Sequence, residues 1–181
     1  MSAALIPRLG RDRRGAVFVE LAVGMAVLVP MLLMGVELGR FALIQQKLER
    51  LATTVADLNT RADVTTAGQV DAIFAAVPHV MEPFSFVGGA VVVTGVTATS
   101  GGIAQVAWQR RGGTGTAPSR VGTVGNPAAL PAGLTVAPNE SVVVAEVFYD
   151  YQPFLLSLVD GQWLYDRAIL RPRLSDQPIV Q

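Results

Sequence analysis

One acidic residue, Glu20, interrupts the otherwise uncharged stretch 16–36. Gly15 lies five positions before this acid, and a pair of arginines precedes the glycine. A carboxylate at the centre of a membrane helix costs about 2.5–3.5 kcal/mol on insertion scales, so an acid in such a stretch is expected to have a function. A plainer interpretation is a glutamate at the membrane edge whose carboxylate reaches the interface.

The stretch 16–36 has the length of a membrane-spanning helix. As a helix it would span roughly 31 Å, about the thickness of the hydrocarbon layer. Four arginines and one acid precede residue 16, so the first part of the chain carries 4 − 1 = +3 and the remainder 10 − 13 = −3. Basic residues before an apolar run are typical of the cytoplasmic side, so we predict a single span with the N-terminus inside and the C-terminus outside. The run exceeds the apolar region of a removable secretory signal, and we expect it to stay in the mature protein.

Three residues of this helix predict its shape and packing. Pro30 removes the backbone bond to the carbonyl of residue 26, so we expect a kink there, although membrane helices also tolerate proline. Gly35 and Gly39 form a pair of small residues four apart, which favours close contact with another helix.

The helical pattern continues beyond the apolar run. Apolar residues recur at alternating spacings of three and four, which predicts one helix from about 37 to 62 whose stripe lies on a domain core. These stripe residues are Phe41, Ile44, Leu48, Leu51, Val55 and Leu58. A second, short helix is predicted at about 66–76, ended by Pro78. Its inward residues are Val70, Ile73, Phe74 and Val77.

From about residue 88 to 173 the apolar period changes to two, which indicates a sheet. We expect about four strands, at 90–99, 103–110, 141–151 and 163–171. Alternation places Ala104, Val106 and Trp108 on one face of the second strand. In the third strand it places Val143, Ala145, Val147, Tyr149 and Tyr151 on one face, and Glu146 and Asp150 on the other. Residues 111–139 are rich in glycine and proline and predict a long surface loop, with a possible short strand near 119–124.

These elements predict an α+β fold. A long N-terminal transmembrane helix continues into a domain in which an antiparallel sheet of about four strands packs on the helix. The predicted organisation is a basic leader at 1–15, a transmembrane helix at 16–36 and a domain at 37–181 outside the cytoplasm.

The sequence offers no candidate for catalysis. It contains no cysteine and one histidine, His79, which we interpret as a loop residue and not as a metal ligand. The glycines at 112–115 lack the lysine and helix start of a phosphate-binding loop. Arg110 and Arg111 beside Trp108 are interpreted as an exposed strand end, because the chain has no broad basic surface for nucleic acid. We therefore predict no enzyme, no cofactor and no metal site.

The N-terminal pattern resembles a known processing site. Gly15, followed by Ala16 and then Glu20, is similar to the site of type IV prepilins, where a membrane aspartyl peptidase cuts after the glycine. Glycine allows the extended backbone that a peptidase requires. The resemblance implies that cleavage gives Ala16 a free ammonium group one helical turn from Glu20.

A narrower resemblance covers about residues 13–63. The Arg-Arg-Gly sequence, Val-Glu-Leu-Ala at 19–22, Pro30 and the Gly-Val-Glu-Leu-Gly-Arg sequence at 35–40 are similar to the TadE-like family of minor pilins or pseudopilins of the tight-adherence (Flp) pilus system. A tyrosine-containing strand at 147–153 is a looser match. The family implies a pilin-like protein of the bacterial inner membrane with a periplasmic domain, and incorporation into an extracellular pilus stays open. It implies the prepilin peptidase, other pilins and the Tad secretion machinery as partners.

The function expected from this resemblance is assembly or priming of Flp-type pili for adhesion and biofilm formation. An alternative from another class is an uncleaved, membrane-anchored binding domain, such as an adhesin or envelope sensor. A membrane-tethered enzyme is a third class, but it would need a polar cleft for which the sequence offers no residues.

Overall fold

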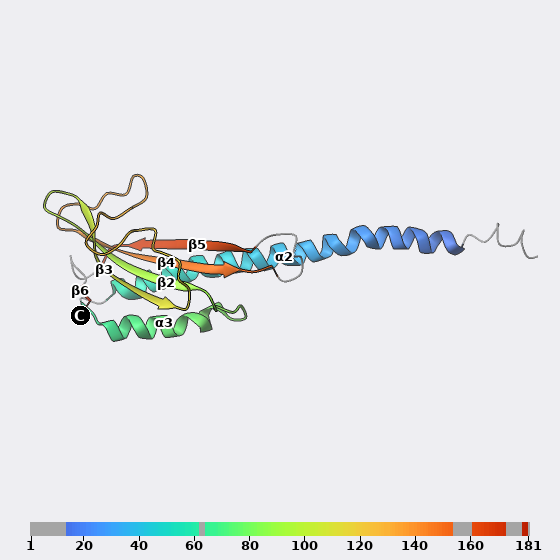
Figure 1. The fold of residues 1–181 in the computed structure, drawn as a ribbon, viewed down its shortest axis with the longest axis horizontal. Coiled ribbons are helices and arrows are strands. Elements are labelled where there is room, and N and C mark those ends of the chain that lie inside the picture. The colour runs from blue at the N-terminus through green and yellow to red at the C-terminus, as the bar shows by residue number, and fades with distance from the viewer. Residues whose placement is uncertain (1–13, 62–63, 154–160, 173–178, 181) are drawn as a thin grey trace, which may run out of the picture. The chain divides into compact units, whose positions relative to one another are not determined.

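The computed structural model describes residues 14–61, 64–153, 161–172 and 179–180 (Figure 1). A long N-terminal helix is followed by a four-stranded antiparallel sheet that packs against helices, which confirms the predicted α+β fold class. The chain divides into two compact units whose boundary along the helix lies between Arg40 and Phe41.

Helix α2 extends from Arg14 to Thr60 and contains Pro30 without interruption of the helical assignment. In the part of the first unit that the structure describes, the large apolar side chains from Val17 to Val36 are mostly exposed. This helix is long and apolar enough to cross a membrane, by length and composition. Within the described residues, no other part of the chain buries this apolar surface.

The distal half of α2 contributes one face to the core of the second unit. Of the predicted stripe, Ile44, Leu48, Leu51 and Val55 are buried and Phe41 is partly buried. Leu58 is 42% exposed, so its predicted inward position is wrong. The 3-4 spacing assumes 3.5 residues per turn, whereas a straight α-helix has 3.6, so the buried face drifts by about 20° per heptad. The drift brings three other residues into the buried set, namely Ala52, Ala56 and Asn59.

Helix α3 extends from Ala67 to Met81 and begins with a capping box. The Thr66 hydroxyl accepts the N–H of Gln69, and the Gln69 side chain accepts the N–H of Thr66. Pro78 lies inside the helix and does not end it, contrary to the prediction. A proline in the last turns removes one backbone bond, and here the buried Met81 side chain anchors the turn beyond it. Pro83 disfavours the helical conformation at residue 82, where the helix stops.

The main sheet has the strand order β3-β2-β4-β5, and all neighbours are antiparallel. The strands are β2 Ala90–Ala98, β3 Ala104–Gly113, β4 Ser141–Tyr151 and β5 Gln162–Leu170. A separate parallel pair joins β1 Val64–Thr65 to β6 Ile179–Val180. Pairs β2–β3 and β4–β5 are neighbours in sequence, whereas the link from β3 to β4 returns the chain to the other side of β2.

A β-bulge in β3 changes the predicted faces of that strand. Trp108 pairs with Gly95 but Val106 pairs with Val96, so Ala107 is the extra residue. Trp108 consequently lies with the helix-side core and Val106 with the core of the opposite face, and the prediction that they share a face is wrong. The indole crosses Gly95 so closely that a Cβ there would lie 2.1 Å from its Nε1 atom. Only glycine leaves room for this contact.

The two faces of the sheet are covered differently. On one face, α2 and α3 pack over the alternating inward residues of β4 that the sequence predicts, from Val143 to Tyr151. On the other face, the segment 114–140 packs Val121 and Val136 against Val96 and Val142. This segment contains no strand at 119–124, only an isolated bridge between Gln105 and Pro127. It is therefore a cover over the second face, and we call it the cover segment.

Candidate functional site

The predicted processing site lies at the start of α2. The described part of α2 extends from Arg14, so Gly15 and Ala16 lie at its beginning. A Cβ added at Gly15 would meet nothing within 4 Å outside its own helix backbone, so no described side chain packs against this position.

Glu20 is exposed on α2 one turn after Ala16. It makes no hydrogen bond or ion pair with any residue in the part of the chain that the structure describes. It lines a shallow hollow of about 340 Å³ together with Val17, Leu21, Gly24, Met25 and Leu28. Its carboxylate thus stands at one end of an apolar surface without a partner from these residues.

A second hollow continues this surface along the helix. It has a volume of about 470 Å³ and is lined by Leu28, Met31, Leu32, Gly35 and Val36. Leu28 belongs to both hollows, so together they form one groove above Gly24 and Gly35. Gly35 is thus placed with Glu20, whereas the predicted partner glycine, Gly39, does not line the groove. Gly24 was missed, although positions 20, 24 and 35 share one face of a 3.6-residue helix.

A second acid, Glu37, follows the apolar run. Its side chain is 7% exposed and its carboxylate lies 3.3 Å from the guanidinium of Arg40. The 17 residues from Glu20 to Glu37 correspond to about 26 Å of helix, somewhat less than the hydrocarbon thickness. The acids therefore bracket an uncharged segment of membrane dimensions.

A third carboxylate, Glu146, lies in the centre of the sheet and was not singled out as functional. It is fully buried on the face that the cover segment occupies. Three donors reach it: the Ser119 hydroxyl, the Arg120 backbone N–H at 2.8 Å and the Tyr165 hydroxyl at 3.1 Å. The signal in the sequence was an acid inside a run of valines, at a position that alternation places away from the helices.

Tyr165 connects this carboxylate to the surface. Burial, followed by the charge of Glu146 and its hydrogen bond, raises the pKa of Tyr165 to about 12. The guanidinium of Arg120 lies 3.9 Å above the ring of Tyr165, in the geometry of a cation–π contact. The cover segment is therefore attached to β4 and β5 by its own backbone and side chains at residues 119 and 120.

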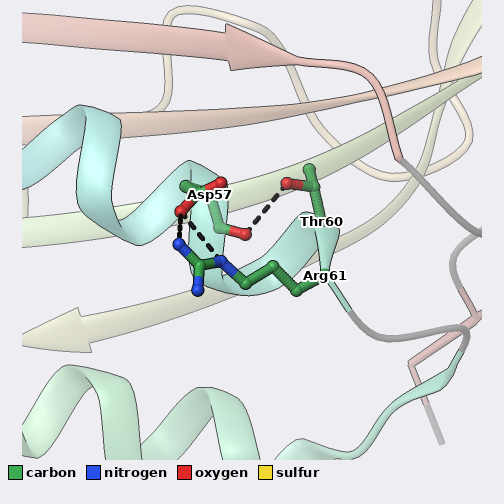
Figure 2. A network of polar contacts seen from close by, with 3 residues as sticks. All are labelled: Asp57, Thr60 and Arg61. Carbon is green, nitrogen blue, oxygen red and sulfur yellow. Dashed lines mark hydrogen bonds and ion pairs between the residues drawn. The ribbon is translucent and has the colours of Figure 1, made fainter.

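The C-terminal end of α2 carries a local polar network (Figure 2). The Arg61 side chain donates to the Asp57 carboxylate, and the Thr60 hydroxyl donates to the Asp57 backbone carbonyl. Hydrogen bonding and charge from Asp57 raise the pKa of Arg61. These contacts fasten a helix end and are not arranged around a cavity.

The described residues contain no group of three or more histidines, cysteines or acids that could hold a metal ion. His79 lies exposed in the last turn of α3 and not in a loop as predicted, with Nδ1 3.2 Å from the carboxylate of Glu82. Arg110 forms an ion pair with Asp71 at 3.2 Å, which joins β3 to α3. None of these groups converges with another on a cleft that resembles an active site.

Comparison with known proteins adds one finding. Residues 15–57 match the model of a family described as TadE-like protein. Neither a curated protein nor a solved structure gave a significant match. The matched region begins at Gly15, includes Glu20 and the apolar run, and ends in the buried half of α2. Residues 15–57 of the chain are therefore similar to TadE-like proteins.

Proposed function

We propose that this chain is a minor pilin or pseudopilin that takes part in the assembly or priming of Flp-type pili for adhesion and biofilm formation. Residues 16–36 anchor it in the bacterial inner membrane, with the sheet domain in the periplasm. The observation that carries this proposal is Glu20, exposed and without a described partner, one turn from Ala16 in the segment that matches the TadE-like family.

Processing is the first step of the proposed mechanism. The prepilin peptidase cuts the peptide bond between Gly15 and Ala16 after the first helical turn opens. Opening this turn breaks few backbone bonds, because the first N–H groups of a helix are not bonded within it. Gly15 favours the open form, since glycine is a poor helix former and loses the most conformational freedom in a helix.

The cut creates the cation that Glu20 otherwise lacks. The new ammonium group of Ala16 lies one turn from the carboxylate, within reach of its own helix or of a neighbour. Little water competes with the pair at the membrane boundary, so its attraction exceeds that of an exposed pair in solution. An intermolecular pair fixes the axial register of two helices.

The groove above Gly24 and Gly35 supplies the packing that the charge pair cannot. Membrane helices associate where small residues let the backbones approach. In our proposal a neighbouring pilin helix lies in this groove, with its amino group at the level of Glu20. In this arrangement the charge pair sets the axial register of the two helices, and the groove provides their packing contact.

Two experiments test the proposal. Mass spectrometry of the protein from piliated cells is expected to show a chain that begins at Ala16, and a chain that retains Arg13 and Arg14 would refute processing. Glu20→Ala is expected to abolish or strongly reduce piliation while the protein still inserts in the membrane. Glu49→Ala, at an exposed position of the same helix beyond the apolar run, is the matched control and should leave piliation normal.

The alternative is an uncleaved, membrane-anchored binding domain. It is favoured by the helical conformation of Arg14 and Gly15 in α2, because the helix forms in the uncleaved chain. In this case the N-terminus stays intact in cells with an active peptidase, and Glu20→Ala leaves adhesion unchanged.

A further inference from the structure

One end of the second unit gathers exposed apolar groups around the residue at which the chain enters that unit. The ring of Phe41 meets the ring of Tyr151 edge-on, with centroids 5.3 Å apart. Beside Tyr151, Asp150 pairs in register with Trp163 of β5. The Cβ of Asp150 also lies 3.7 Å from the position that a Cβ on Gly88 would occupy. The end of β4, the start of β5 and the turn before β2 are thus at the same end as Phe41.

Large apolar side chains remain exposed at this end. Val87 is 81% exposed and Trp163 is 48% exposed. Two open hollows of about 440 Å³ lie beside them. One is lined by Pro83, Phe84, Phe86 and Val87 among others, and the other by Pro118, Arg120, Phe148 and Trp163 among others.

The charges at this end suit a surface that carries phosphate groups. The guanidinium of Arg120 stacks on Tyr165 and has no carboxylate partner among the described residues. Two acids also lie near this end: Asp150 accepts from the uncharged Gln152 amide at 2.8 Å, and Glu82 lies 3.2 Å from His79, so Arg120 is the group proposed to attract a phosphate. A guanidinium that keeps its donors available is well suited to a phosphate oxygen.

The length of chain between the apolar run and Phe41 limits how far this end can be from the membrane. Only five residue steps separate Val36 from Phe41. Even fully extended they reach at most about 18 Å, and as helix about 8 Å. This limit applies to Phe41 itself, whatever the arrangement of the two units.

We propose that this end of the sheet domain is a lipid-contacting surface that rests on the phospholipid head groups of the membrane that α2 crosses. Trp163 and Val87 enter the interfacial layer, where the amphipathic indole is favoured. Arg120 binds lipid phosphate. The inference rests on the proposed membrane span, and it adds a second, reversible attachment that holds the domain against the bilayer before assembly.

The two tryptophans of the chain provide a test with an internal control. Full-length Trp108→Phe protein reports on Trp163, and full-length Trp163→Phe protein reports on Trp108. Trp108 pairs with Gly95, five residues and about 17 Å along β2 from its start at the proposed surface. Both proteins are placed in phosphatidylcholine nanodiscs that contain a lipid with a quencher on its head group, and tryptophan emission is measured.

The proposal expects quenching of Trp163 and little quenching of Trp108. Val87→Asp and Arg120→Gln in the Trp108→Phe background should weaken the quenching of Trp163. Val124→Asp and Arg50→Gln change another exposed valine and another exposed arginine of the same unit and should not. Equal emission of Trp163 with and without the quencher lipid would overturn the inference.

Failure of the membrane span gives a different result. In that case the protein does not enter nanodiscs and is released from membranes by alkaline carbonate, so the proposed function fails as well. A protein that stays inserted while Trp163 responds only to a soluble quencher refutes the lipid-contacting surface alone.

Discussion

Replacing Glu146 by glutamine tests whether the cover segment is held by a charged acceptor. The carboxylate is fully buried and accepts from Ser119, Arg120 and Tyr165. A hydrogen bond to a charged group contributes about 1.5–3 kcal/mol, against about 0.5–1.5 kcal/mol for a neutral pair. Glutamine keeps the shape but loses the charge and turns one acceptor into a donor. The two ranges differ by about 1–1.5 kcal/mol per bond, so over three bonds we expect the free energy of unfolding to fall by about 3–4.5 kcal/mol.

The assay is urea unfolding of the full-length protein in detergent, followed by tryptophan emission. Trypsin cleavage after Arg120 should also become faster, because this residue lies where the cover segment is fastened. Glu140→Gln is the matched control: its carboxylate lies 2.7 Å from Arg171 and is 41% exposed, so the expected cost is at most about 1 kcal/mol. A Glu146→Gln protein no less stable than Glu140→Gln, with unchanged cleavage, would refute the argument.

Two further predictions concern the same unit. Because the pKa of Tyr165 is raised to about 12, the neutral phenol stabilises the fold fully below about pH 10 and less as the pH rises from 10 to 12. Tyr165→Phe should remove this part of the alkaline loss, and urea midpoints between pH 9 and 12 that fall equally in both proteins would contradict it. Leu48→Ala should cost about 2–5 kcal/mol because Leu48 is fully buried, whereas Leu58→Ala should cost little, and equal losses of Tm would disprove the assigned helix face.

The helices and strands of this fold could be predicted from local sequence patterns. The wrong predictions arose where contacts with distant residues or small departures from the regular period decide which side chains are buried. The stripe from Ile44 to Val55 is a repeat within one helix, and the sequence is sufficient to find it. The predicted burial of Leu58 was wrong because the prediction extended a repeat of 3.5 residues per turn, whereas a straight α-helix has 3.6. The predicted face of Trp108 was wrong because one extra residue at the β-bulge reverses the alternation of β3. The bulge places Trp108 against Gly95, which lies on another strand.

The cover segment could not be predicted for a related reason. It has no regular period, because its backbone pairs with the ends and edges of strands that are remote in sequence. The N–H of Val106 donates to the carbonyl of Asn126, and the N–H of Gly115 donates to the carbonyl of Gly89. Its apolar residues are few and widely spaced, so they resemble those of an exposed loop. The only sign of the cover segment's binding position in the sequence is Glu146, an acid within a strand of valines.

The proposed processing site, by contrast, could be suggested from the sequence alone, because its residues lie within one and a half helical turns. Gly15, Ala16 and Glu20 need no tertiary contact to come together, and the family match begins at the first of them. The groove that includes Gly24 was less accessible, since it requires the faces of a helix to be compared over four turns. What a single sequence omits in both cases is the partner.

The acids of the chain support this distinction. Glu146 is buried and receives three donors from its own sheet and cover, and Glu37 is buried beside Arg40. In the described part of the chain, both buried carboxylates therefore have a partner. Glu20 lies in the most apolar segment and receives no partner from the described residues. In the proposed membrane span an unpaired carboxylate is costly, so our proposal assigns its partner to an amine that appears after cleavage, on its own helix or on a neighbouring subunit.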